Sequence, residues 1–348
     1  MPSPLISDAV DRLLAGEDIG RQGAADVLDV ILSGEAGEAQ TAAFLIALRA
    51  KGETAEEIAG LASVIRRRAR RVEAPAGPFI DTCGTGGGAS SFNVSTAAAF
   101  VAAGAGVAVA KHGNRSATSR SGSADVLEAL GARIDLDPDG VSRCLQETGV
   151  GFMFAPAHHP AFAHVVPVRR ALGVRTVFNM IGPLTNPAGA PRQLLGVSDA
   201  HALERIATAL AALGTERALV VRGRDGLDEV STAATTDVFE VVDGGVRRTE
   251  IDPAALDVAP AGEADIAGGS PDENAEVVRR IVGGGTGPAA DLVALNAGAA
   301  LWVAGVARDL ADGLTRARES IASGAAGQRL DAFVDATHRF ATPTAERR

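Results

Sequence analysis

The sequence predicts an α/β fold: a small all-helical N-terminal domain, followed by a large α/β domain whose mainly parallel central sheet is flanked by helices. Residues 1 to about 71 show only helical spacing of apolar residues. From residue 79 onward, short apolar runs alternate with helical patterns, as in domains built around a parallel sheet. Aromatic residues make up only 3% of the 348 residues, so the core must be aliphatic, which suits helices packed on a buried sheet.

The N-terminal part predicts four helices. Apolar residues recur at helical spacing in three segments, 5–14, 27–31 and 44–48, separated by glycine-containing breaks. Thr54 and Glu57 form a capping box that opens a fourth helix. This helix ends in the run Arg66–Arg71. We interpret the run as a solvated helix end, favoured by the helix dipole, in preference to a nucleic-acid-binding patch.

The stretch EAPAGP (73–78) reads as a linker, after which the runs PFIDTC, GVAVAK and ALVVRG predict strands. Residues 238–251 contain two runs around an Asp-Gly-Gly turn and predict a hairpin. The last hundred residues are predicted to be mainly helical, including a helix opened by a capping box at Ser270–Glu273. We therefore expect a helical domain at 1–72, joined by helices from about 160–183, and an α/β domain at 73–348.

Composition excludes some classes of function and indicates the cellular compartment. The formal net charge of −10 argues against a nucleic-acid binder, which would need a basic face. Two cysteines, Cys83 and Cys144, cannot form a disulfide framework and indicate a reducing compartment. The N-terminus MPSPLISDAV lacks the features of a signal peptide, and no apolar run reaches the roughly 18 residues of a membrane span. We expect a soluble cytoplasmic protein that has no membrane partner.

The stretch DTCGTGGGASSFNVST (81–96) predicts a phosphate site. If residues 79–82 form a strand and a helix starts near Asn93, then Gly84–Gly88 form a turn with free backbone N–H groups at a helix N-terminus. GTGGGA also fits the dinucleotide fingerprint, but that site needs an acidic residue about 20 positions on. Here the next strand ends in the basic stretch Lys111–Arg115. This argues against NAD and leaves NADP a weak alternative.

The stretch KHGNRSATSRSGS (111–123) is rich in hydrogen-bond donors with little bulk, which a polyanionic ligand requires. The alternative is a polar surface loop that ends in an N-cap at Ser123. The ligand-binding interpretation is favoured because the stretch directly follows a predicted buried strand.

Several of these stretches together resemble the anthranilate phosphoribosyltransferase family. They are GTGG, NVST, KHGNRSATSRSGSADVLEALG, HHPAFAHVVPVRRALGVRTVFNMIGPLTNPA and GRDGLDEVS, in this order along the chain. The resemblance implies a small helical domain, a large α/β domain that binds phosphoribose, and a homodimer formed through the helical part. It also implies an activity in tryptophan biosynthesis: transfer of phosphoribose from 5-phosphoribosyl-1-pyrophosphate (PRPP) to anthranilate with Mg²⁺, giving N-(5-phosphoribosyl)anthranilate and pyrophosphate.

The resemblance also assigns roles to residues of this chain. The PRPP-binding residues it implies are Gly84, Gly87, Gly88, Ser91 (or Ser90), Asn93, Val94, Ser95, Thr96, Lys111, His112, Gly113, Asn114, Arg115, Ser116, Ala117, Thr118, Ser119 and Ser123. Gly84, Asn114 and Arg169 are implied to contact anthranilate, and Ser95, Asp228 and Glu229 are implied to hold the metal.

The glycine stretch departs from the family at one point. The family typically reads G-T-G-G-D-G, whereas here the spacing from Gly84 to Asn93 is one residue shorter and the Asp is absent. A carboxylate beside pyrophosphate repels it unless Mg²⁺ bridges them, so we expect this change to bear on metal dependence.

Residue chemistry agrees with these roles. The planar guanidinium of Arg169 suits a carboxylate, whereas Arg170 reads as a surface residue. Asp228 and Glu229 follow a predicted strand, and adjacent hard carboxylates suit Mg²⁺. Lys111, His112 and Arg115 are electrostatic candidates for the charge that develops on leaving pyrophosphate. No residue is required as a general base, and His112 is a candidate.

Two other groups have competing interpretations. His158, His159 and His164 could suggest a metal site, but a structural or substrate-channel role is favoured because the spacing lacks a good ligand set. Cys83 could be a nucleophile, but no partner base is evident, which favours a small buried hydrophobic role.

Two rival functions remain open at this point. One is a pyrimidine-nucleoside phosphorylase-like enzyme of the same fold, which would use inorganic phosphate and would not need Asp228 and Glu229 for a metal. The other is a non-catalytic homologue that binds nucleic acid, against which the net charge speaks.

Overall fold

The structure is a computed structural model that describes residues 3–89, 91–116 and 120–341. The predicted ligand residues Ala117, Thr118 and Ser119, and the alternative Ser90, lie outside the described residues. Among the helices that the structure describes, none is long and apolar enough to cross a membrane.

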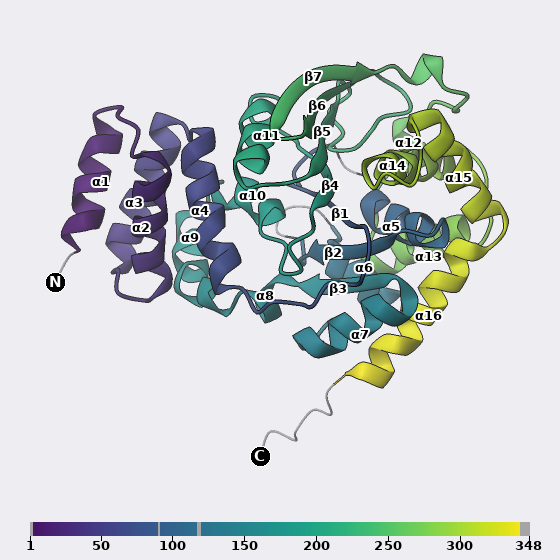
Figure 1. The fold of residues 1–348 in the computed structure, drawn as a ribbon, viewed down its shortest axis with the longest axis horizontal. Coiled ribbons are helices and arrows are strands. Elements are labelled where there is room, and N and C mark those ends of the chain that lie inside the picture. Colours follow the sequence, from purple (N-terminus) through teal and green to yellow (C-terminus); the bar gives the residue numbers. More distant parts are fainter. Residues whose placement is uncertain (1–2, 90, 117–119, 342–348) are drawn as a thin grey trace.

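The N-terminal helices form one side of the molecule (Figure 1). They are α1 (Pro4–Leu14), α2 (Gly20–Leu32), α3 (Glu38–Lys51) and α4 (Ala55–Arg68). The capping box at Thr54 and Glu57 is present, with each side chain bonded to the other's backbone N–H. Apolar residues of the four helices share one core, in which Phe44, Leu48 and Ile58 are fully buried. The predicted helical N-terminal region is thus confirmed.

A second group of short helices packs against these four. It contains α8 (Ala155–His158), η1 (Pro160–His164), α9 (Val166–Leu172), α10 (Phe178–Ile181) and η2 (Gly182–Leu184). α9 contacts α3, and α10 contacts α4. The division into 1–72, joined by helices from about 160–183, and 73–348 stays a prediction with which these contacts agree.

The central sheet has seven strands in the order β3-β2-β1-β4-β5-β6-β7. They are β1 (Phe79–Gly84), β2 (Ala108–Gly113), β3 (Val150–Phe154), β4 (Arg192–Gly196), β5 (Arg217–Gly223), β6 (Thr236–Val242) and β7 (Gly245–Ile251). The first five are parallel, and β6 and β7 form the predicted hairpin on the β5 edge. Asp243 and Gly244 have positive φ in its turn, as a two-residue hairpin loop requires. The mainly parallel sheet is confirmed.

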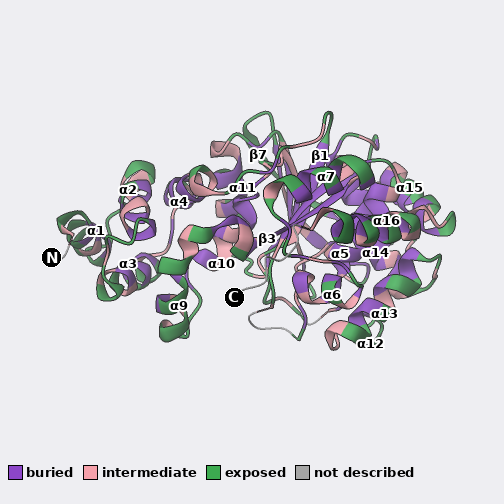
Figure 2. Cartoon of the chain, turned by 90° about the horizontal axis from the view of Figure 1, so that it is seen from below, coloured by how far each residue is buried: buried purple, intermediate pink, exposed green. Residues whose placement is uncertain are grey.

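Alternate residues of each strand face different helices, because strand side chains alternate between the two faces of a sheet. Ile80 and Leu219 join the core of one face, whereas Phe79 and Val220 point to the other. The first face is covered by α5 (Val94–Gly104), α6 (Ser123–Ala129), α12 (Glu263–Ile266), α13 (Pro271–Val282), α14 (Pro288–Val303), α15 (Leu310–Ala322) and α16 (Ala325–Phe340). The second is covered by α7 (Pro138–Thr148) and α11 (Leu203–Ala212), next to the N-terminal helices. Figure 2 shows the resulting buried layer through the middle of the large domain.

The strand order determines where a ligand site can form. The chain adds β2 and β3 on one side of β1, and β4 and β5 on the other, so the order reverses at β1. Open α/β sheets bind their ligands at the carboxyl ends of the strands beside such a reversal. The carboxyl ends of β1, β2 and β4 are Gly84, Gly113 and Gly196.

Candidate active site

Three neighbouring cavities lie at this carboxyl edge. The aromatic cavity, about 540 Å³, lies between the ends of β1 and β2 and the segment 155–183, and includes His112, Phe162 and Phe178. The central cavity, about 300 Å³, is lined by the glycine loop, Lys111 and residues 114–116 and 121–123. The loop cavity, about 430 Å³, lies along residues 86–89 and 91–95. Asp228 and Glu229 line the last two cavities.

The glycine loop wraps around the carboxylate of Asp228. Gly86 and Gly87 have φ of +65° and +82°, which favours glycine, and the Gly86 backbone forms a hydrogen bond with the Asp228 carboxylate. A Cβ on Gly88 would lie only 2.5 Å from Asp228 Oδ1. The shortened glycine stretch therefore has no room for a side chain at this point.

Gly88→Ala is expected to lower kcat/KM for PRPP about tenfold at limiting Mg²⁺, because the added methyl must displace the Asp228 carboxylate. Initial rates as a function of Mg²⁺ concentration measure the effect. Gly37→Ala is the matched control, since Gly37 lies far along the chain in the helical domain, has negative φ and has no atom within 4 Å of its added Cβ. Equal rates for the two variants would contradict the prediction.

Lys111 is buried at the end of β2, with only 3% of its surface exposed. Its Nζ donates to the Thr82 carbonyl and to Ser95 Oγ, the latter at 3.3 Å. Burial lowers the pKa of Lys111, while the nearby carboxylates of Asp81 and Glu229 act in the opposite direction. A cation fixed in this way has electrostatic influence on anything bound in the central cavity.

Asp228 and Glu229 have the environment of a cation site. Both are half-buried, and neither forms an ion pair within 4.0 Å in the part of the chain that the structure describes. Burial raises the pKa of both carboxyls, that of Glu229 to about 8. Ser95 hydrogen-bonds Glu229 through its backbone.

Residues 3–89, 91–116 and 120–341 contain no group of three His, Cys, Asp or Glu side chains that could hold a metal ion alone. Two carboxylates suffice for Mg²⁺ when phosphate oxygens and water complete its shell. The donor set therefore fits a magnesium ion that binds together with a phosphorylated ligand.

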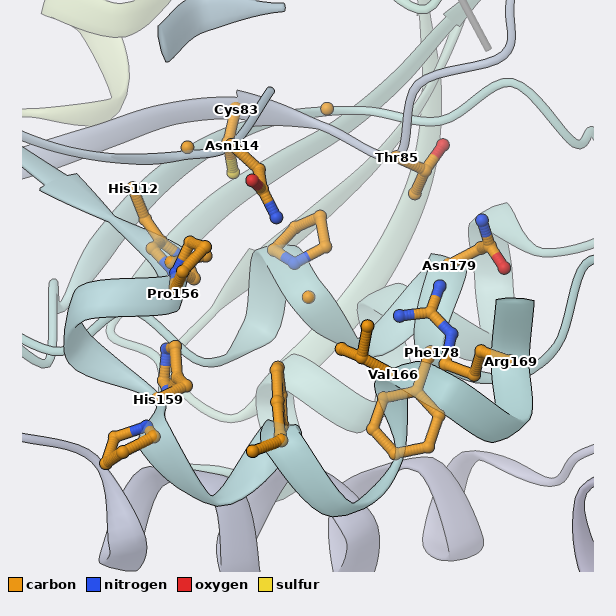
Figure 3. Close-up of a pocket in the computed structure, with 18 of the residues that line it drawn as sticks. Cys83, Thr85, His112, Asn114, Pro156, His159, Val166, Arg169, Phe178 and Asn179 are labelled. Carbon is orange, nitrogen blue, oxygen red and sulfur yellow. The ribbon is translucent and has the colours of Figure 1, made fainter. Parts of the chain in front are cut away.

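The aromatic cavity has features of a site for a flat aromatic carboxylate. Asn114 and Arg169 reach into it from opposite sides, and Phe178 lies beside Arg169 (Figure 3). The guanidinium carbon of Arg169 lies 5.1 Å from the centre of the Phe178 ring. Burial lowers the pKa of Arg169, although it remains a cation at neutral pH. Phe162 stacks on His159 in the same wall. A planar donor beside rings can hold a carboxylate and an attached benzene ring.

His112 and Arg115 are placed differently from simple cationic phosphate ligands. Burial lowers the pKa of His112 well below its usual range, so the imidazole is neutral, and its Nε2 has no partner among the described residues. Arg115 lies at the rim of the central cavity and is ion-paired with Asp125 and Glu128. It can reach a phosphate only by exchanging these partners.

The structure brings together most of the predicted ligand residues. Those that line the three cavities are Gly84, Gly87, Gly88, Ser91, Asn93, Val94, Ser95, Lys111, His112, Gly113, Asn114, Arg115, Ser116, Ser123, Arg169, Asp228 and Glu229. Thr96 is buried in the first turn of α5 and lines none of the three.

Sequence reasoning missed several cavity residues, among them Thr85, Ser121, Arg175 and Asn179. Asn179 lines both the aromatic and the central cavity, and it stands within VRTVFNMIGPLTNP, one of the stretches that carry the resemblance. Arg175 lies over the glycine loop, where its Nη2 donates to the Gly86 carbonyl at 3.3 Å. The resemblance was thus a usable signal for these two residues.

The histidines follow the favoured interpretation, whereas Cys83 is only half-buried and lines both the aromatic and the central cavity. His159 lines the aromatic cavity, and the neighbouring His158 is fully buried. The pKa of each is lowered by burial. Burial raises the pKa of the Cys83 thiol well above its usual value, so no reactive thiolate is present at neutral pH.

Comparison with known proteins agrees with the fold. Residues 76–327 match the family described as "Glycosyl transferase family, a/b domain", and residues 7–69 match its helical bundle domain. A relative named anthranilate phosphoribosyltransferase from Anaeromyxobacter dehalogenans (strain 2CP-C) is 53% identical over 334 residues, covering 96% of this chain and 99% of the relative. Another of that name from Rubrobacter xylanophilus is 51% identical over 339 residues, covering 97% and 99%.

Solved structures give the same result. The anthranilate phosphoribosyltransferase of Thermus thermophilus superposes with a TM-score of 0.90 at 44% identity, covering 95% of this chain and 99% of that one. The Saccharomyces cerevisiae enzyme in complex with PRPP and Mg superposes with a TM-score of 0.88 at 29% identity, covering 96% and 98%. The chain belongs to the anthranilate phosphoribosyltransferase family.

Proposed function

We propose that this protein transfers the phosphoribosyl group of PRPP to anthranilate, giving N-(5-phosphoribosyl)anthranilate and pyrophosphate, as a step of tryptophan biosynthesis. One observation carries the assignment of substrates to cavities. The aromatic cavity with Arg169 and the central cavity with Lys111 share Gly84, His112 and Asn114 as lining residues. An aromatic carboxylate in the first cavity and a phosphoribosyl group in the second would therefore meet at one wall.

The predicted ligand residues remain the proposed ones. Glycine-loop and α5 residues would bind the pyrophosphate, and residues 111–119 and Ser123 would surround the phosphates and the ribose. Gly84, Asn114 and Arg169 would hold anthranilate. Asp228, Glu229 and Ser95 would hold Mg²⁺, which when bound neutralises charge on the pyrophosphate oxygens.

The reaction requires charge stabilisation and alignment. The bond from ribose C1 to the pyrophosphate oxygen breaks with its electron pair, and Lys111 offsets the charge that gathers on the leaving group. The lone pair of the anthranilate amine forms the new bond to C1 from the opposite side. The resulting ammonium then loses a proton. We propose that neutral His112, placed at the junction of the two cavities, is a hydrogen-bond acceptor for this proton rather than a source of positive charge.

The proposal is tested by incubating the purified protein with PRPP, anthranilate and Mg²⁺ and identifying the products by mass spectrometry. Phosphoribosylanthranilate and pyrophosphate in equal amounts are the expected result. Incubation of uridine or thymidine with inorganic phosphate tests the phosphorylase alternative, and release of the free base there, without phosphoribosylanthranilate in the first reaction, would overturn the proposal. The two relatives described above, which are 53% and 51% identical to this chain, are named anthranilate phosphoribosyltransferase, and this favours the transferase over the phosphorylase.

The metal-free protein is expected to lose thermal stability progressively between about pH 5 and pH 8. The pKa of Glu229 is raised by burial, from 4.5 to about 8. A carboxyl whose folded pKa is raised contributes its full stability below its unfolded pKa, and this contribution is lost progressively as the pH rises from the unfolded to the folded value. Unfolding temperatures measured in chelator should therefore fall over this range. Glu229→Gln should flatten the curve. Parallel curves for the two proteins would contradict the assignment.

We propose that the protein is a cytoplasmic homodimer that pairs through its helical domain and binds neither nucleic acid nor membrane. Leu14 is 69% exposed on α1, and Leu5 and Ile46 are exposed nearby on α1 and α3. A second copy could cover these apolar side chains. Both cysteines are free, as expected in a reducing compartment.

Leu14→Glu is expected to shift the protein from dimer to monomer at micromolar concentration, because a charge in the middle of an apolar interface is left without water. Light scattering coupled to gel filtration measures the mass. Leu14→Met is the control that keeps the interface apolar. A monomeric wild-type protein, or a dimeric Leu14→Glu variant, would contradict the proposed interface.

A further inference from the structure

The central sheet splits between β1 and β2 just below the proposed active site. β1 pairs with β2 only as far as Ile80↔Val109, but with β4 as far as Gly84↔Gly196. The last four residues of β2, 110–113, keep their pairing with β3. Lys111 and His112 stand on this part of β2, so the width of the split determines where they lie.

Two side chains fill the split and replace the missing backbone pairing. Alternate residues of a strand direct their N–H and C=O groups to the same neighbour, so Ala110 and His112 both face β1. Asn186 Nδ2 donates to the Ala110 carbonyl at 2.8 Å and to Asp81 Oδ2 at 2.8 Å. Asp81 Oδ1 accepts from the His112 N–H at 3.2 Å. Both backbone groups are thereby satisfied by side chains.

Both side chains are themselves held in place. Asp81 is fully buried on β1, and Asn186 is 6% exposed. The Ala188 N–H donates to Asn186 Oδ1 at 2.9 Å, which fixes the orientation of the amide. Asn186 belongs to the segment that continues from Gly182 and Pro183, which line the aromatic cavity. The pair thus joins β1, β2 and one wall of that cavity.

We infer that Asp81 and Asn186 are positioning residues for the transfer reaction, an inference that rests on the proposed function. They touch no substrate. They set the separation of β1 and β2, and through it the position of His112 at the junction of the two cavities and of Lys111 against β1. Arg169 on α9 and the phosphate-binding start of α5 belong to other elements, so substrates can still bind when the split changes.

Asn186→Asp is the first variant of the test. It places a carboxylate against Asp81 and removes the donor to the Ala110 carbonyl, in the same volume. Because displacement of reacting groups by about 1 Å can cost about 100-fold, kcat is expected to fall by about that factor. KM for PRPP and KM for anthranilate are expected to stay within about threefold, since the start of α5 and Arg169, which lie on other elements, still hold the two substrates.

The exchange variant Asp81→Asn with Asn186→Asp keeps the experiment informative if the single variant is unstable. Asn at 81 can donate to Asp at 186 and still accept from the His112 N–H, while the net charge is unchanged. The bond to the Ala110 carbonyl is lost, and the carboxylate near Lys111 moves from position 81 to position 186. We expect kcat to recover at least about tenfold relative to Asn186→Asp alone.

Val141→Ala controls for a merely structural effect. Val141 is buried on α7 in the core beneath β2 and β3, outside the site, so its truncation lowers stability without touching the split. A selective loss of kcat in Asn186→Asp that the exchange variant reverses supports the inference. If Asn186→Asp and Val141→Ala have similar unfolding temperatures and equal kcat values, the inference is contradicted.

The activity of the wild-type protein distinguishes a failure of this inference from a failure of the proposed function. An inactive wild type contradicts both, whereas an active wild type with fully active variants contradicts only the positioning role. KM values that rise together with the fall in kcat also contradict it, because they show that the pair maintains substrate binding and not alignment.

Discussion

Lys111→Met is expected to lower kcat/KM for PRPP by about 10²–10³-fold, because one fixed positive charge in the wall of the central cavity is removed. Methionine keeps the volume of the apolar stem but cannot donate to the Thr82 carbonyl or to Ser95. Two carboxyl groups nearby, Asp81 and Glu229, also lose their cation. Steady-state rates at saturating anthranilate measure the change.

A second buried lysine provides the matched control for this variant. Lys51 lies in the helical domain, where it is ion-paired with Asp18 and Glu57. Lys51→Met should lower the unfolding temperature and leave kcat/KM for PRPP within about threefold, because its ion pairs lie far from the transferred group. A Lys111→Met protein that keeps more than a tenth of the wild-type kcat/KM would contradict the role of Lys111.

Arg169→Gln is expected to raise KM for anthranilate about 30-fold or more, with a much smaller effect on PRPP. A hydrogen bond to a charged group contributes about 1.5–3 kcal/mol, and the guanidinium is the cation beside the aromatic cavity. Arg170 on the same helix is exposed, so Arg170→Gln changes the net charge equally without touching the cavity. Equal KM values for the two variants would place the anthranilate carboxylate elsewhere.

Periodicity and turn chemistry predicted the elements of the fold because these signals are local. Helical spacing in residues 5–14, the capping box at Thr54 and the Asp-Gly turn at Asp243 each depend on a few neighbouring residues. The family resemblance predicted most of the candidate ligand residues, because the motifs that carry it include the loops that follow β1, β2 and β5. Local signals do not show which loops meet, and the strand order was not predicted.

The rest of the site depends on three-dimensional burial and could not be predicted from neighbours in sequence. His112 looks like a cationic ligand in the string Lys-His-Gly-Asn, but burial among other side chains lowers its pKa and keeps it neutral. Arg115 looks free to bind phosphate, yet helix α6 supplies the carboxylates that pair with it. Asn186 is 105 residues from Asp81, and only the fold brings the two together.

The central claim is that the aromatic and central cavities hold anthranilate and PRPP for a direct transfer that needs Mg²⁺. Anthranilate fluorescence, followed after mixing with the protein and PRPP in the presence and absence of Mg²⁺, tests it most directly. A decay that requires the protein, PRPP and the metal together is the predicted result. Constant fluorescence with all components present, in a folded protein, would contradict the account.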